Sequence, residues 1–163
     1  MGQIIIKKES EMKVKCRYED YTYVGNKNVY QCEFDIQTIP ENITIIPDGT
    51  HQSASRGNED VDSVLFVNCN LSKVPQGLTK TFPNLKVLNI WSSGLKTVTK
   101  TDLAEYKNLE RIYISYSAIK FLPGDLFKEF KNLEAITIDS NKVELIEPNI
   151  LDGLDKLKIV NFR

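Results

Sequence analysis

Apolar residues recur along most of the chain at a fixed interval of 24 positions. Asn84-Leu85, Asn108-Leu109 and Asn132-Leu133 follow this interval, and Lys156-Leu157 continues the series. Because only 41% of the residues are hydrophobic, columns filled without exception indicate a genuine internal repeat. The six columns are Val61, Leu85, Leu109, Leu133, Leu157; Val64, Leu88, Ile112, Ile136, Val160; Phe66, Ile90, Ile114, Ile138, Phe162; Leu71, Leu95, Ile119, Val143; Val74, Val98, Leu122, Ile146; and Phe82, Tyr106, Phe130, Leu154.

The spacing inside each unit is L-x-x-L-x-L-x-x-N/C-x-L, which resembles the leucine-rich repeat. This resemblance implies an α/β-type solenoid with a curved parallel β-sheet on its concave face. Irregular, 3-10 or short helical returns are expected on the convex face. Alternation in the strands predicts that Leu88 and Ile90 face the interior, while Asn89 and Trp91 face the concave surface. The predicted units are 61–84, 85–108, 109–132, 133–156 and a partial unit at 157–163.

The ninth position of the repeat normally holds asparagine, whose side chain binds backbone groups at the turn after the strand. Here the position reads Cys69, Ser93, Ser117 and Asn141. Serine is a shorter hydrogen-bonding residue than asparagine. We therefore expect a less continuous ladder of turn hydrogen bonds and a lower stability, without a change of fold.

Residues 13–60 lack the repeat and are predicted to form an N-terminal cap and a crossing loop. Two segments alternate apolar and polar residues, one around Val14 to Tyr18 and one around Tyr30 to Phe34, with Gly25-Asn26-Lys27-Asn28 between them. This pattern predicts a β-hairpin. Each strand carries one cysteine on its apolar face, so we expect a disulfide between Cys16 and Cys32. Residues 1–12 are expected to be disordered or foreign to the native chain.

Several features favour an extracellular location. Disulfides persist in oxidising compartments, and two N-x-S/T triplets make Asn42 and Asn70 candidate glycosylation sites. The longest apolar run is Ile4 to Ile6, so the chain contains neither a signal peptide nor a predicted membrane span. The loop at 47–60 is polar, and its His51 is expected to be a surface histidine.

The cap, the segment Gly49-Thr50-His51 and the entry Phe82-Pro83-Asn84-Leu85 resemble the secreted leucine-rich-repeat proteins of dipteran insects. The resemblance covers the chain from about residue 14 onward. It implies an extracellular or cell-surface binding protein. The chain departs from this pattern because it lacks a signal peptide and ends at Arg163, inside a repeat. We expect either a fragment or an end covered by another chain.

Charge and motifs exclude several other classes of function. The net charge is −1, which gives no basis for a nucleic-acid partner. No CxxC, HExxH or GxSxG motif occurs, so we predict no enzyme activity, no metal and no cofactor.

The candidate ligand-binding residues lie on the predicted concave face. They are Trp91, Tyr113, Arg111, Tyr116 and Asn89. Aromatic residues and arginine are enriched at binding hot spots. The alternative is that they are solvated sheet residues that only stabilise cross-strand pairs.

These features predict an extracellular recognition module that binds protein, peptide or glycan on its concave face. One alternative is a structural or adhesion module that self-associates edge-on through its open C-terminal end. Another is an intracellular repeat adaptor, which would contain only free thiols.

Overall fold

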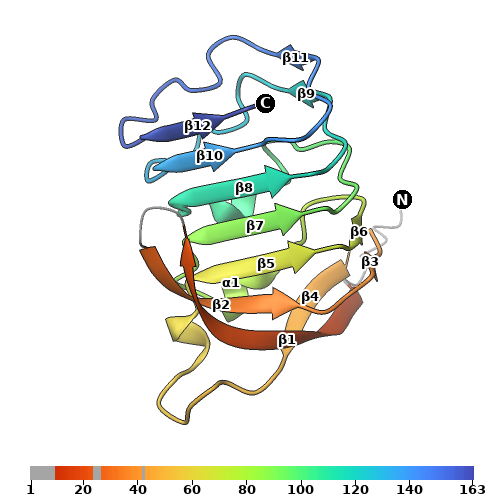
Figure 1. Cartoon of the computed structure of the whole chain (residues 1–163), viewed down its shortest axis with the longest axis vertical. Coiled ribbons are helices and arrows are strands. Elements are labelled where there is room, and N and C mark those ends of the chain that lie inside the picture. The colour runs from red at the N-terminus through yellow and green to blue at the C-terminus, as the bar shows by residue number, and fades with distance from the viewer. Residues whose placement is uncertain (1–9, 24–26, 42) are drawn as a thin grey trace, which may run out of the picture.

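The computed structural model describes residues 10–23, 27–41 and 43–163. Its main sheet has eight strands in the order β12-β10-β8-β7-β5-β2-β1-β4 and forms a curved stack (Figure 1). The strands are β1 (Ser10–Tyr23), β2 (Lys27–Phe34), β4 (Ile43–Asp48), β5 (Ser63–Val67), β7 (Val87–Trp91), β8 (Arg111–Ser115), β10 (Ala135–Thr137) and β12 (Ile159–Asn161).

Short elements connect these strands on the other side of the molecule. Two small sheets pair β3 (Thr38–Ile39) with β6 (Asn70–Leu71) and β9 (Phe121–Leu122) with β11 (Leu145–Ile146). The helical elements are α1 (Leu78–Thr81) and two 3-10 turns at Asn58–Asp60 and Ala104–Tyr106. The returns are therefore short and irregular, as the repeat predicts.

The strands of the repeat pair in parallel, and partners in adjacent strands are one repeat apart. Ser63 pairs with Val87, Val87 with Arg111, Arg111 with Ala135, and Ala135 with Ile159. A register that equals the sequence period places each column of the sequence in one row across the sheet. The predicted solenoid with its parallel sheet is confirmed.

Apolar side chains of successive units fill the interior. In β7, Leu88 and Ile90 are fully buried, and their equivalents in β5 and β8 are buried too. Phe34 of the cap stacks on Phe66, with the ring centroids 4.6 Å apart, so the core continues from the cap into the first repeat. Ile146 and Val160, in the last units of the stack, are exceptions and are 38% and 41% exposed.

The cap contains the predicted hairpin, and β1 pairs with β2 in antiparallel fashion. Cys16 and Cys32 form the predicted disulfide, with their Cα atoms 5.5 Å apart. Gly25 and Asn26 of the expected turn lie outside the described residues. One contact of the cap was not predicted: β2 also pairs in parallel with β5 and thereby joins the repeat sheet directly.

Two expectations about the ends of the cap were wrong. β1 begins at Ser10, so residues 10–12 are not part of a disordered extension; residues 1–9 lie outside the described residues. Pro47 and Asp48 belong to β4, which pairs in parallel with β1, and not to the crossing loop. A proline is tolerated there because β4 is the edge of the sheet.

The turn ladder varies with the residue at the ninth position. The side-chain amide of Asn141 donates to the carbonyls of Ile114 and Asp139 at 2.8 and 2.9 Å, and its oxygen accepts from the Ile119 N–H at 3.2 Å. Ser117 shares one 2.9 Å bond with the Ser93 hydroxyl. Asparagine thus bonds to backbone groups of the preceding repeat, whereas serine bonds mainly to the side chain of the equivalent serine.

This difference predicts unequal losses of stability. Asn141→Ala should lower the free energy of unfolding by about 2 kcal/mol, since it leaves buried backbone groups without partners. Ser117→Ala should lower it by less than about 1 kcal/mol. Urea unfolding followed by circular dichroism measures both, and equal losses would contradict the ladder interpretation.

Candidate binding surface

The concave face is built from three rows of side chains, because every second strand residue points to that side. The first row includes Val87 and Arg111, the second Asn89 and Tyr113, and the third Trp91 and Ser115. Strand register sets the order of side chains within each row. The rows therefore place residues from separate repeats side by side on one rigid sheet.

Tyr23, at the end of β1, covers the middle of this face. Its ring stacks on Tyr113, with the centroids 5.3 Å apart and the planes 5° apart. Its hydroxyl donates to Gln31 Oε1 at 2.9 Å, accepts from Asn89 Nδ2 at 3.2 Å, and lies 3.2 Å from Ser63 Oγ. Burial raises the pKa of this phenol above its ordinary value. The end of β1, which rises across the sheet to the beginnings of β5 and β7 (Figure 1), is thus fastened in place.

Arg111 lies in the first row and is almost fully buried, with 9% of its surface exposed. One Nη donates to the Tyr113 hydroxyl at 3.3 Å, and the other lies 3.8 Å from a Glu134 carboxylate oxygen. Its Nε has no hydrogen-bond partner. This guanidinium is therefore part of the packed sheet and offers little surface to a ligand.

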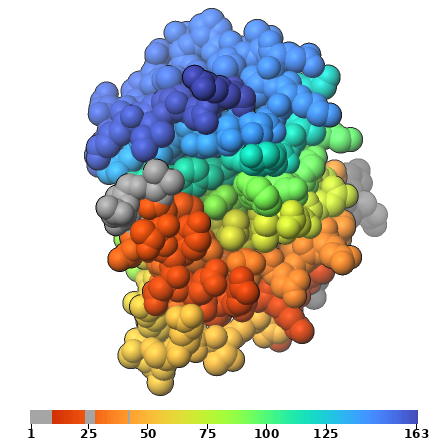
Figure 2. All heavy atoms as spheres, in the orientation of Figure 1, coloured from red at the N-terminus to blue at the C-terminus, as the bar shows by residue number. Residues whose placement is uncertain are grey.

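Trp91 and Tyr116 stay open at the other end of the strands, where they are 40% and 55% exposed. Their rings meet edge to face, with the centroids 5.1 Å apart and the planes at 63°. Tyr116 has a φ of 52°, the left-handed conformation that reverses the chain after β8. In Figure 2 the red hairpin covers one side of the face, and green and teal segments from the β7 and β8 region are open beside it.

The predicted ligand residues therefore form two separate groups. Trp91 and Tyr116 form an exposed pair. Asn89 and Tyr113 contact Tyr23, and Arg111 contacts Tyr113. A role for any of them in binding stays a prediction. Tyr23 is the residue that the sequence interpretation missed.

Comparisons with known proteins agree with this architecture. The family described as leucine rich repeat matches residues 107–161, and no curated protein matches the chain. A chain in the structure of the Toll–Spatzle complex, "a molecular hub in Drosophila development and innate immunity", aligns at 25% identity and a TM-score of 0.58. The chain has the leucine-rich-repeat fold.

The alignment with this Drosophila structure covers 73% of the present chain but only 16% of the other. A glycosylated form of the same complex gives a TM-score of 0.57 at 17% identity and covers 76% of this chain and 18% of that one. The leucine-rich-repeat chain described here thus spans less than a fifth of the length of either match.

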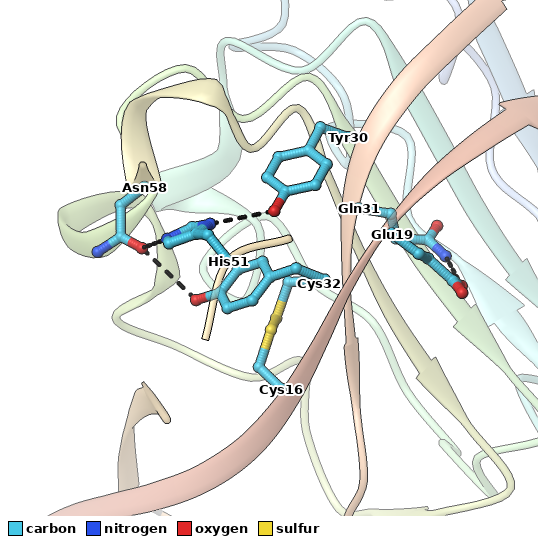
Figure 3. Close-up of a disulfide and its surroundings, with 8 residues drawn as sticks. Cys16, Glu19, Tyr30, Gln31, Cys32, His51 and Asn58 are labelled. Atoms are coloured by element: carbon cyan, nitrogen blue, oxygen red, sulfur yellow. Dashed lines mark hydrogen bonds between the residues drawn. A yellow bond between two sulfur atoms is a disulfide. The ribbon is translucent and has the colours of Figure 1, made fainter. Parts of the chain in front are cut away.

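A cluster of aromatic rings holds the crossing loop of this leucine-rich-repeat chain on its cap (Figure 3). The His51 ring lies 4.0 Å from the Tyr18 ring, and its nitrogens lie 3.1 Å from Asn58 Oδ1 and 3.3 Å from the Tyr30 hydroxyl. Arg56 lies over the Tyr30 ring, 4.2 Å from its centroid. His51 is half-buried, and these contacts fix the crossing loop on the cap. Its contacts with the two tyrosines were not predicted from the sequence.

The structure describes one of the two candidate glycosylation sites. Asn42 lies outside the described residues. Asn70 is exposed and begins the two-residue strand β6. Glycosylation of either residue stays a prediction.

Within residues 10–23, 27–41 and 43–163, no group of three or more His, Cys, Asp and Glu side chains is arranged to hold a metal ion. No helix in these ranges is long and apolar enough to cross a membrane.

Proposed function

We propose that this chain is an extracellular protein-recognition module that binds its partner through the Trp91–Tyr116 surface. The observation that carries this proposal is the exposed aromatic pair on a rigid sheet whose middle is already occupied by Tyr23. Large aromatic residues supply much of the binding energy at protein interfaces. An exposed tryptophan next to an exposed tyrosine is therefore a strong candidate for the centre of an interface.

The proposed location rests on three observations. A disulfide between Cys16 and Cys32 is suited to an oxidising compartment, and an intracellular adaptor would keep these thiols reduced. The resemblance to secreted dipteran proteins and the likeness to a chain of the Toll–Spatzle complex support the same location. The likeness to a chain of the Toll–Spatzle complex also favours a protein as the partner over a glycan.

The test is alanine substitution followed by a binding measurement. A screen against extracellular proteins, read by surface plasmon resonance, would first identify a partner. Trp91→Ala should then weaken binding by roughly 30-fold or more, the effect of losing a hot-spot residue. Tyr116→Ala should weaken binding in the same direction.

Phe121→Ala is the matched control. Phe121 is 41% exposed, which is close to the exposure of Trp91, but it lies in β9, outside the main sheet. Its removal should leave the affinity unchanged. Equal effects of Trp91→Ala and Phe121→Ala, or normal binding by Trp91→Ala, would reject the assigned surface.

A further inference from the structure

Asp139 lies next to the aromatic pair, in the turn after β10. One carboxylate oxygen accepts a hydrogen bond from the Ser115 hydroxyl, and the other accepts from the Ser140 hydroxyl at 3.2 Å. Ser115 in turn pairs with Trp91 in the sheet. The half-buried carboxylate is thus held in the third row of the concave face, on the same side as Trp91.

Asp139 differs from two other acidic residues around the concave face. Glu33 forms an ion pair with Arg17 at 2.7 Å, and Asp62 forms one with Lys86 at 2.9 Å. Among the residues that the structure describes, no lysine or arginine forms an ion pair with Asp139. The two hydrogen bonds of its carboxylate come from neutral hydroxyls.

The aromatic pair has the geometry to receive a cation. An edge-to-face contact at 63° leaves ring faces available, and indole is the ring that attracts cations most strongly. A long basic side chain can also pack its aliphatic stem on an aromatic surface. The backbones of β7 and β10 are two strand spacings apart, about 10 Å, so a stem over Trp91 would direct its charged end toward Asp139.

The backbone holds these groups in position without a ligand. The Ser92 N–H donates to the Ser115 carbonyl at 3.0 Å, and the Tyr116 N–H donates to the Asp139 carbonyl at 3.2 Å. The turns that carry the three side chains are thus bonded to one another in sequence. A surface fixed in this way loses little conformational entropy on binding.

From these contacts we propose that the Trp91–Tyr116 surface receives an arginine or lysine side chain of a protein partner, with the Asp139 carboxylate as its counter-ion. The inference rests on the proposed function and adds the chemistry of the partner. A partner that presents an acidic segment would be repelled by Asp139. A glycan would use the ring faces but would not depend on the charge of the carboxylate.

The experiment uses Trp91 as a reporter, because it is the only tryptophan in the chain. Its fluorescence is titrated at low ionic strength with three probes, namely a hexa-arginine peptide, a hexaglutamate peptide and maltohexaose. The arginine peptide should change the emission of Trp91 in a saturable way, whereas the other two should not. Asp139→Asn should lower the affinity for the arginine peptide roughly fivefold or more. The substitution removes a charge-assisted contact, while the hydrogen bonds from the two serine hydroxyls can be kept.

Glu144→Gln is the control, because it removes one negative charge, as Asp139→Asn does. Glu144 is exposed and pairs with Lys120 at 2.9 Å in the return segment, so its loss should leave the titration unchanged. If both variants bound the arginine peptide equally weakly, the effect would come from net charge alone and the inference would be overturned. Unchanged affinity of Asp139→Asn for the peptide would overturn it too. A stronger response to maltohexaose would replace the basic partner with a glycan.

The two proposals can fail separately. If the arginine peptide gives no response but a screened protein partner still requires Trp91, the cationic assignment falls and the recognition surface stands. If the arginine peptide binds through Asp139 but no protein partner depends on Trp91, the site binds cations and the proposed function falls.

Discussion

Tyr23→Ala should lower the free energy of unfolding by about 3 kcal/mol, the loss typical of a buried aromatic side chain. The substitution removes the ring that stacks on Tyr113 and the hydroxyl that joins Gln31 to Asn89. The polar groups of Gln31 and Asn89 would then lack their shared partner at the centre of the face. Urea unfolding followed by circular dichroism measures the change.

Two further variants test which part of Tyr23 matters and whether its neighbour Tyr21 is equally important. Tyr23→Phe keeps the stacked ring and removes only the hydroxyl, so about 1–2 kcal/mol should be lost. Tyr21→Ala changes a neighbouring tyrosine that is 46% exposed and should cost less than about 1 kcal/mol. If Tyr21→Ala and Tyr23→Ala were equally destabilising, Tyr23 would not anchor the hairpin.

The repeat could be predicted because its information is local and periodic. Leu88 and Ile90 are buried by the alternation of a strand, and Ile112 and Ile114 repeat the pattern one unit later. Stacking in register then needs no information beyond the period. The exposure of Trp91 follows from the same alternation.

The position of Tyr23 over the concave face could not be predicted from the 24-residue repeat. Tyr23 precedes the repeats, and its contact with Asn89 joins residues 66 positions apart. One signal was present in the sequence: Tyr21 and Tyr23 alternate with the apolar face of β1 and share the polar face of Arg17 and Glu19. Two tyrosines at the end of a polar strand face indicate a surface that another part of the chain covers.

The cap shows a second limit of local patterns. The crossing loop was predicted to begin at Pro47, but β4 includes Pro47 and Asp48, because a strand at a sheet edge does not need every N–H. His51 was placed by its polar neighbours in sequence, whereas the rings of Tyr18 and Tyr30 determine its surroundings. Both features depend on contacts between segments that no repeat relates.

Removal of the Cys16–Cys32 disulfide should lower the free energy of unfolding by about 3 kcal/mol, the chain-entropy value for a loop of this size. Removal of the disulfide should also destabilise the first repeat, because β2 pairs with β5 and Phe34 packs on Phe66. The double variant Cys16→Ser, Cys32→Ser, compared with the unchanged protein in urea, measures the effect.

Cys69 provides the control for this experiment. Burial raises the pKa of its thiol to about 11, so at pH 8 the folded protein should resist alkylation by iodoacetamide, which reacts with thiolates. Mass spectrometry should find no labelled cysteine in the folded, unreduced chain, one after unfolding, and three after unfolding with reduction. Three labels without a reductant would contradict the disulfide and, with it, the extracellular location, because the cap would then hold free thiols.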